Sequence, residues 1–199
     1  ANTYVLLKNK QNEANYGDLG EQTVSNQTLL ANCIAENGSF TNVTIQGNAE
    51  LHNISGTVLL SGAAYNLNII DCWLSFTNTD NVTLDMVQWR RGSVTMDSRY
   101  RIQILSGLLL DNVDVQANFY TPGVYPKYRH CRINTRQDNF TDFEYIDCEV
   151  NADIYQFPEF MTLTISGTDY DGYVYRGLFA KNTVTGTAKL MLSPQSGVN

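Results

Sequence analysis

Acidic residues stand at several points where two carboxylates would project from one face of a strand. Asp142 and Glu144 are two residues apart, and so are Asp147 and Glu149. At that spacing two strand residues lie on the same face, about 7 Å apart. Glycoside hydrolysis uses two carboxylates roughly 5 to 10 Å apart, so these four residues are the candidate catalytic groups. The alternative is that they are solvated surface carboxylates, because this spacing also arises by chance.

Arginines form a second group of residues, one whose side chains could bind an anionic ligand. Residues 90–136 contain seven of them, and Arg90, Arg91, Arg99 and Arg101 are the candidate ligand-binding arginines. Guanidinium groups bind carboxylates and sulfates through two parallel hydrogen bonds, which suggests an acidic polysaccharide as ligand. We expect Arg99 and Arg101 to share a strand face and to stack with other arginines into one basic patch. The alternative is pairing with nearby acids, including those of a neighbouring subunit.

Tyrosines gather in the second half of the chain. Tyr120, Tyr125 and Tyr128 surround two prolines, in a segment that we expect to be a loop or an edge. Exposed aromatic rings stack on sugars and also anchor protein interfaces, so these three tyrosines are candidate ligand-binding residues. The alternative is a C-terminal core or cap.

Cysteine and histidine offer no metal site. The four cysteines include no CxxC pair, and the two histidines do not complete a zinc ligand set with them. No phosphate-binding glycine loop is present. We therefore expect neither a metal nor another cofactor.

Charge is distributed unevenly along the chain. The formal net charge is −7 and the pI is about 4.7. Residues 90–136 nevertheless hold eight basic residues against three acidic ones. An acidic chain lacks the concentrated Lys and Arg that phosphate binding needs, so we expect no nucleic-acid partner. No apolar run approaches the roughly 20 residues of a membrane helix, so we expect no membrane insertion.

A short repeat indicates the elements that position these residues. In each copy a turn-forming polar residue precedes an apolar residue, a residue of any type and a second apolar residue. The copies include Asn42-Val43-Thr44-Ile45, Asn66-Leu67-Asn68-Ile69, Asp71-Cys72-Trp73-Leu74, Asn81-Val82-Thr83-Leu84, Asn112-Val113-Asp114-Val115, His130-Cys131-Arg132-Ile133 and Asp147-Cys148-Glu149-Val150. Alternation with a period of two is typical of strands with one buried face. Two units would make one coil of about 20 residues.

The repeat predicts an all-β fold, a right-handed parallel β-helix of roughly eight short rungs. Residues 1–24 are the expected N-terminal cap or linker, since an open solenoid end exposes unpaired backbone. Residues 25–199 are the expected β-helix domain, looser toward its C-terminus, with turn-rich excursions near 118–128 and 166–177. Cys33, Cys72, Cys131 and Cys148 are all expected at the first apolar position, as buried fillers. Two disulfides are the alternative.

The units from about Asn32 to Val150 resemble the right-handed parallel β-helix superfamily, which includes pectate lyases, polygalacturonases and phage tailspikes. The high Asn and Tyr content and the few lysines make the chain most similar to viral or phage receptor-binding spikes. That resemblance implies a homotrimer on a virion surface, or another extracellular location, that binds a cell-surface polysaccharide.

Three functions follow from these features. A binding or adhesion module of tailspike type is favoured, because a short solenoid suits a spike module. A polysaccharide lyase or glycoside hydrolase is the first alternative, and a purely structural fibre or capsid-associated solenoid is the second.

Overall fold

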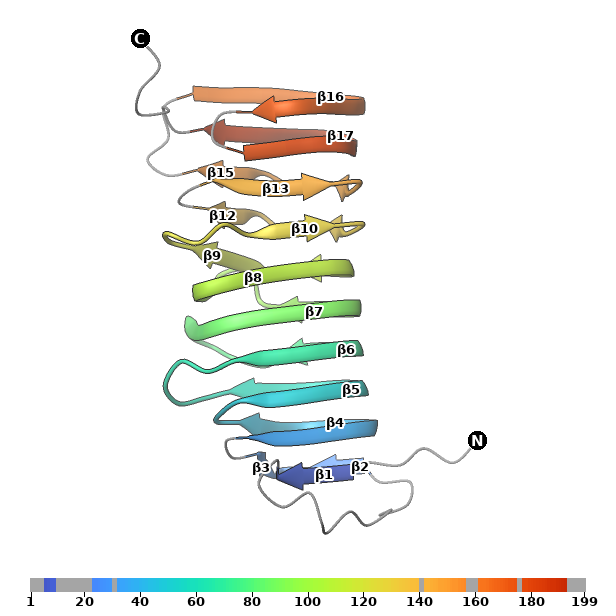
Figure 1. The fold of residues 1–199 in the computed structure, drawn as a ribbon, viewed down its shortest axis with the longest axis vertical. Coiled ribbons are helices and arrows are strands. Elements are labelled where there is room, and N and C mark those ends of the chain that lie inside the picture. Colours follow the sequence, from blue (N-terminus) through green and yellow to red (C-terminus); the bar gives the residue numbers. More distant parts are fainter. Residues whose placement is uncertain are drawn as a thin grey trace.

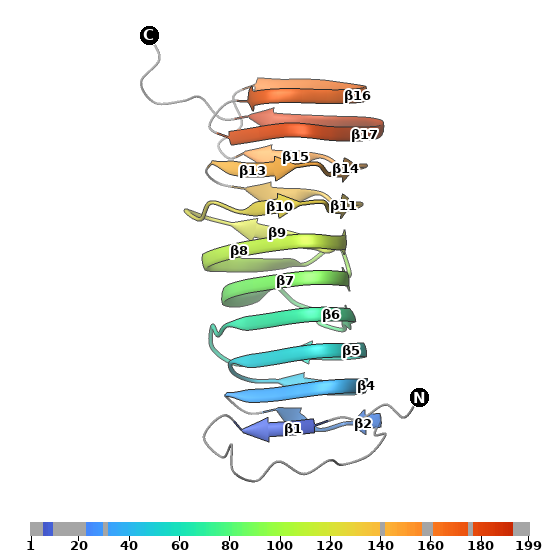
Figure 2. The same cartoon turned by 45° about the vertical axis from the view of Figure 1, so that its right-hand side comes forward.

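The computed structural model describes residues 6–9, 23–29, 32–139, 142–156, 161–174 and 177–192. These residues form strands and turns, and no helix occurs among them. The strands stack in parallel into a β-solenoid of about seven turns, as two views of the ribbon show (Figures 1 and 2). The predicted fold class is therefore confirmed, with about one turn fewer than the eight predicted.

The 17 strands of the described residues form one continuous sheet that winds around the core. The N-terminal strands are β1 (Leu6–Asn9), β2 (Thr23–Ser25), β3 (Thr28–Leu29), β4 (Cys33–Ile45) and β5 (Ala49–Leu60). The middle strands are β6 (Leu67–Phe76), β7 (Val82–Met96), β8 (Arg101–Gln116), β9 (Asn118–Thr121), β10 (Lys127–Arg129) and β11 (Arg132–Ile133). The C-terminal strands are β12 (Gln137–Asn139), β13 (Phe143–Ile146), β14 (Glu149–Val150), β15 (Ile154–Gln156), β16 (Met161–Val174) and β17 (Gly177–Leu192).

Register places equivalent residues of successive coils on top of one another. Cys33 pairs with Ala49, Ala49 with Leu67 and Leu67 with Val87, so these coils take 16, 18 and 20 residues. Neighbouring strands in a sheet lie about 4.8 Å apart. Residues of one column therefore contact each other directly although many residues separate them in the sequence.

One interior column shows how the core is built. Its members all have an exposed fraction of 0% and are Ala35, Leu51, Ile69, Trp89, Leu110, Tyr128, Tyr145 and Phe179. The rings of Tyr128 and Tyr145 are stacked, with centroids 4.4 Å apart and planes 5° apart. Complete burial of each large apolar side chain contributes about 1.5–3 kcal/mol. The stacked columns therefore stabilise the coil along its whole length.

Three of the four cysteines occupy the interior position that the repeat predicts. Cys72, Cys131 and Cys148 are buried free thiols, each in the residue that follows a corner of the coil. Burial raises the pKa of the Cys72 thiol to about 11, so it is neutral at physiological pH. The prediction is wrong for Cys33, because this partly buried free thiol begins β4 and pairs in register with Ala49, in a different column.

An antiparallel strand lies at each end of the parallel stack. β1 pairs antiparallel with β4, and β16 pairs antiparallel with β17 (Figure 1). Such strands occupy backbone hydrogen-bonding groups that a bare terminal coil would leave open. Within the predicted cap, only residues 6–9 and 23–24 belong to the described part of the chain.

The two predicted excursions contain strand residues. The segment 118–128 includes β9, which pairs in parallel with β8 and β12, and the first residues of β10. The segment 166–177 lies in the β16–β17 pair, apart from residues 175–176, which are outside the described residues. No helix that could cross a membrane occurs in the described parts of the chain.

Candidate functional site

One corner of the coil is built in every turn by a non-glycine residue with left-handed backbone. The φ angles lie between 52° and 62° at Asn37, Asn53, Asp71, Arg91, Asn112, His130, Asp147 and Lys181. Each of them directly follows a residue that pairs in register with its counterparts in the neighbouring coils. We call this column the left-handed corner.

Residue type at the left-handed corner is only partly explained by the backbone. Asn, Asp and His are the non-glycine residues enriched in the left-handed region, whereas other residues cost roughly 1–2 kcal/mol there. Arg91 and Lys181 are therefore the two corner residues that the backbone does not favour. Strained backbone often marks a functional position, so the surroundings of Arg91 are of interest.

A cleft of about 580 Å³ opens on the outside of this corner and includes Arg91 in its wall. We call it the Trp73 cleft. Its lining residues are Asp71, Trp73, Arg91, Gly92, Asn112, Val113, Asp114, His130, Cys131, Arg132, Asp147 and Glu149. They come from β6 to β14, so the cleft runs across several coils along the solenoid.

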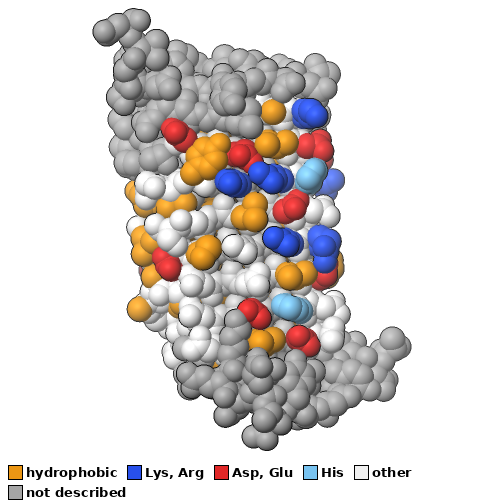
Figure 3. Space-filling view, in the orientation of Figure 1, with side chains coloured by type: hydrophobic (Ala, Val, Ile, Leu, Met, Phe, Trp, Pro, Cys, Tyr) orange, Lys and Arg blue, Asp and Glu red, His pale blue; other side chains and the backbone are white. Residues whose placement is uncertain are grey.

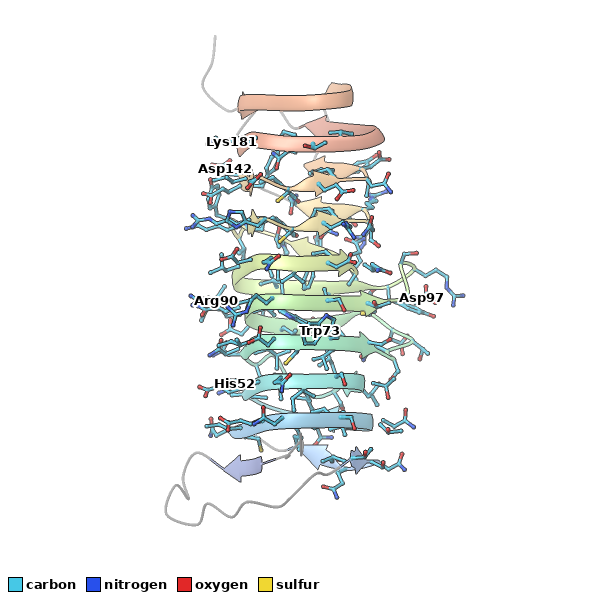
Figure 4. The ribbon with its side chains drawn as sticks, turned by 90° about the vertical axis from the view of Figure 1, so that its right-hand side faces the viewer. His52, Trp73, Arg90, Asp97, Asp142 and Lys181 are labelled. Atoms are coloured by element: carbon cyan, nitrogen blue, oxygen red, sulfur yellow. The ribbon has the colours of Figure 1, made fainter. Side chains whose placement is uncertain are left out.

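The indole of Trp73 forms one end of the cleft. Trp73, Ser93 and Asp114 are register partners on β6, β7 and β8. Ser93 and its neighbour Gly92 have little or no side chain, so open space remains between the indole and the Asp114 side chain. The strands that carry these two residues, β6 and β8, lie two strand spacings apart, or about 10 Å. The Trp73 side chain is 52% exposed (Figure 4), which leaves its ring available to a ligand.

Ion pairs fix the positions of charged side chains around the Trp73 cleft. Arg91 donates two hydrogen bonds to Asp71, one of them 2.7 Å long from Nη2 to Oδ2. Arg132 Nε lies 3.1 Å from Glu149 Oε2. The Arg91 guanidinium lowers the pKa of the Asp71 carboxyl, chiefly through these hydrogen bonds. The cleft therefore presents fixed charges and hydrogen-bonding groups to solvent.

His130 connects two carboxylates at the left-handed corner. Its Nδ1 lies 2.9 Å from Asp111 Oδ1, and its Nε2 lies 3.7 Å from Asp147 Oδ2. These three residues come from successive coils. The imidazole is thus positioned by acids on both sides, between the Trp73 cleft and a second hollow.

The second hollow has a volume of about 420 Å³ and lies beside the Trp73 cleft. Its lining residues are Arg90, Arg91, Asp111, Asn112 and His130. Arg91, Asn112 and His130 line both spaces. We call it the Arg90 hollow. Figure 3 shows basic and acidic side chains gathered along the same edge of the coil.

The prediction of a single basic patch is wrong. Arg90 and Arg91 lie at the left-handed corner, whereas Arg99 lies in the turn after β7, where its Nη2 is 2.6 Å from Asp97 Oδ2. Arg90 and Asp97 are on opposite sides of the solenoid in Figure 4. The chain turns around the coil between these arginines, so closeness in sequence does not bring them together.

Arg101 and Tyr120 belong to a separate cluster around a buried carboxylate. Asp138 is 6% exposed and accepts contacts from Arg101 Nε at 3.0 Å, Arg136 Nε at 2.6 Å and Asn118 Nδ2 at 2.8 Å. The Arg101 guanidinium lies 5.5 Å from the Tyr120 ring centroid. Arg101 and Tyr120 thus lie together, but outside the Trp73 cleft.

The other two tyrosines have different surroundings. Tyr128 is completely buried, and its hydroxyl donates a hydrogen bond to Gln137 Oε1 at 2.9 Å. Tyr128 is therefore a core residue, and its prediction as a ligand-binding residue is wrong. Tyr125 is 42% exposed, with the Lys127 ammonium 6.0 Å from its ring centroid, and it does not line the Trp73 cleft.

The four candidate carboxylates do not converge. Asp147 and Glu149 line the Trp73 cleft. Glu144 is 9% exposed, and its Oε1 lies 2.8 Å from Arg129 Nη2, while Asp142 precedes β13 outside the cleft lining. Only the second predicted pair is therefore in a position to meet a ligand of the cleft.

Sequence reasoning missed Trp73, although the signal for it was present. In the copy Asp71-Cys72-Trp73-Leu74 the two apolar positions of the repeat are Cys72 and Leu74, which are buried. The residue between them must point outward. The repeat itself therefore predicts an exposed indole at this position, and exposed aromatic rings are suited to binding sites.

The geometry defines the chain as a parallel β-solenoid protein with an open, charged cleft along one corner. No family model, curated protein or solved structure matches it, so the class rests on the geometry alone. Within the described residues, no group of three or more His, Cys, Asp or Glu side chains is arranged to hold a metal ion.

Proposed function

We propose that this solenoid is a binding module that recognises a cell-surface polysaccharide in the Trp73 cleft. The observation that carries the proposal is an exposed indole at one end of a cleft whose other walls are polar and charged. Aromatic rings pack on the apolar faces of sugars, while fixed carboxylates, amides and guanidinium groups bind hydroxyls. The open form of the cleft suits a polymer that enters and leaves from the side.

Binding is favoured over catalysis by the state of the carboxylates. A glycosidase needs one carboxylic acid whose pKa is raised, so that it can protonate the leaving group. In the Trp73 cleft the pKa of Asp71 is lowered by Arg91, and Glu149 is paired with Arg132. Such pairing suits recognition of hydroxyl groups better than donation of a proton.

The proposal also includes the oligomeric state and the location of the module. By its resemblance to receptor-binding spikes, the module would form a homotrimer on a virion surface or at another extracellular location. Sedimentation equilibrium tests this part directly. A monomer at micromolar concentration would count against the spike and against the structural fibre, while leaving glycan recognition to be judged by binding.

The proposal is tested with a glycan array, followed by titration calorimetry on the glycans that bind. We expect Trp73→Ala to weaken binding at least tenfold, because the ring loses its contact with the sugar. Leu105→Ala is the matched control, since Leu105 is another large apolar side chain, 46% exposed, that does not line the cleft. Equal effects of the two substitutions, or an array without any binding glycan, would contradict the proposal.

A turnover assay on the same glycans separates binding from catalysis. We expect their chain length to stay constant during prolonged incubation with the protein. Shortened products that disappear in Asp147→Asn or Glu149→Gln would instead establish the lyase or hydrolase alternative.

A further inference from the structure

The two adjoining hollows at the left-handed corner differ in the sign of their charge. Asp71, Asp114, Asp147 and Glu149 line the Trp73 cleft with only two arginines to balance them. The Arg90 hollow has the single carboxylate of Asp111 and two arginines, Arg91, which it shares with the cleft and which is paired with Asp71, and Arg90. An anionic group on a ligand is therefore repelled by the cleft and attracted by the hollow beside it.

Arg90 differs from the other arginines in the same stretch of sequence. Six of the seven arginines between residues 90 and 136 form an ion pair with a carboxylate, in most cases as close as a hydrogen bond. Among the residues that the structure describes, no carboxylate pairs with Arg90. Its side chain is exposed at the edge of the hollow.

The acidic residue next to Arg90 on the neighbouring strand, Asp111, is already engaged. Arg90 pairs in backbone register with Asp111 on the next strand. The Asp111 carboxylate, however, contacts His130 Nδ1 at 2.9 Å, on the side away from β7. The structure thus contains an exposed guanidinium whose register partner is committed to another residue.

We propose that the Arg90 hollow binds the anionic group of a glycan, a carboxylate or a sulfate, while a neighbouring sugar ring packs on Trp73. This inference rests on the proposed function and specifies its ligand class. A guanidinium binds either anion through two parallel hydrogen bonds, and the Asn112 amide that lines the same hollow adds a donor. Arg90 stands three residues before Ser93, the register partner of Trp73, so the two groups are on the order of 10 Å apart.

The first test compares oligosaccharides of equal length that contain glucuronate, sulfated galactose or only neutral sugars, by titration calorimetry. We expect Arg90→Gln to weaken binding of at least one acidic class tenfold or more and to reduce the salt dependence of binding. Binding of the neutral oligosaccharide should change less than twofold. Arg99→Gln is the matched control, because Arg99 is exposed and paired with Asp97, which lies opposite Arg90 in Figure 4. The acidic class that loses affinity identifies the anion.

Two results would overturn the inference while the proposed function stands. One is a wild-type protein that binds neutral and acidic oligosaccharides equally through Trp73. The other is an equal loss of both in Arg90→Gln, which would indicate a general effect on the fold or cleft.

A second measurement tests anion binding in the Arg90 hollow without an oligosaccharide or polysaccharide. The Nε–Hε resonance of Arg90 is followed by NMR during titration with sodium glucuronate, sodium sulfate and, as a neutral reference, glucose. We expect a saturable shift of this resonance with at least one of the anions, and no shift of Arg99. If no glycan binds but the Arg90 resonance shifts, the anion site stands and the polysaccharide proposal falls. If the Arg90 resonance does not shift, the inference is wrong.

Discussion

The left-handed corner looks different in the first coils and in the middle coils, although the backbone is the same. In β4 and β5 the corner residues are Asn37 and Asn53, and Asn53 Nδ2 donates a hydrogen bond of 3.0 Å to Asn37 Oδ1. In β6 and β7 the same positions hold Asp71 and Arg91, joined by an ion pair. The φ angles of Asn53 and Arg91 differ by only 9°, 53° against 62°.

The outward column next to this corner differs in the same way. Ser39 and Ser55 occupy it in β4 and β5, whereas in the middle coils it holds Trp73, Ser93, Asp114 and Arg132. A corner needs only a residue that tolerates positive φ, which Asn supplies at little cost. The coil thus fixes where side chains project, and most of the middle coils use those positions for a charge or for an indole.

The largest effect is expected at Gly92, which directly follows the corner residue Arg91. Cys72 and Val113 flank Gly92 in register, yet Gly92 has φ +122°, and a Cβ there would lie 1.8 Å from the carbonyl oxygen of Cys72. We expect Gly92→Val, which introduces the residue of the next coil, to lower the free energy of unfolding by more than about 3 kcal/mol. Urea denaturation followed by circular dichroism measures it.

Gly107→Ala is the control for this substitution. A Cβ at Gly107 would meet only the Met86 side chain, at 3.4 Å from its Cγ. We expect a change of less than about 1 kcal/mol there. If Gly92→Val were as mild as Gly107→Ala, the close approach of β7 to β6 at the corner would be wrong.

The sequence allowed the prediction of the coil and of its length, about 20 residues, but not of how this length varies from one coil to the next. Alternation with a period of two depends only on neighbouring residues, so strands, buried columns and parallel stacking could be predicted. Tyr128 could also have been placed inside, since it alternates with the charged residues Lys127 and Arg129. Coil length varies from about 16 to 21 residues with the turns between strands. This variation decides which side chains come to lie side by side on the surface. The sequence alone therefore could not show that Arg91 and Arg99 lie on different parts of the coil.

An exchange of residues between two left-handed corners is expected to change stability by an intermediate amount. Asn53→Arg places an unfavoured residue in the left-handed region and removes the hydrogen bond to Asn37, so we expect a loss of about 1–2 kcal/mol in unfolding free energy. Arg91→Asn relieves the same backbone cost but removes an exposed ion pair worth up to about 1 kcal/mol. We therefore expect stability in Arg91→Asn to change by less than about 1 kcal/mol.

Thermal unfolding of both variants measures this exchange, and binding supplies a second readout. Arg91→Asn should weaken glycan binding, because the guanidinium lines the Trp73 cleft, whereas Asn53→Arg should not. Arg91→Asn destabilising more than Asn53→Arg would show that Arg91 serves the fold. The corner would then carry no functional signal.

The smallest effect is expected in the turn after β7, where the ion pair between Arg99 and Asp97 does not line the cleft. Arg99 lowers the pKa of the Asp97 carboxyl to about 2, mainly through side-chain hydrogen bonds and also through its backbone N–H. Because the folded pKa is below the ordinary value of 3.8, this pair stabilises the protein above about pH 3.8 and loses its effect as the pH falls toward 2. Both side chains are exposed, so the contribution to stability is small.

Titration of the Asp97 carboxyl by carbon-detected NMR isolates this effect from the rest of the chain. In Arg99→Gln we expect the pKa of Asp97 to rise only part of the way toward 3.8, because the backbone N–H of residue 99 still donates to Oδ1. Arg91→Asn should raise the pKa of Asp71 in the same direction, since Arg91 lowers it. Glycan binding should respond to the change at Asp71, in the cleft, and not to the change at Asp97. A binding affinity that followed the titration of Asp97 would place the ligand outside the Trp73 cleft, which Asp97 does not line.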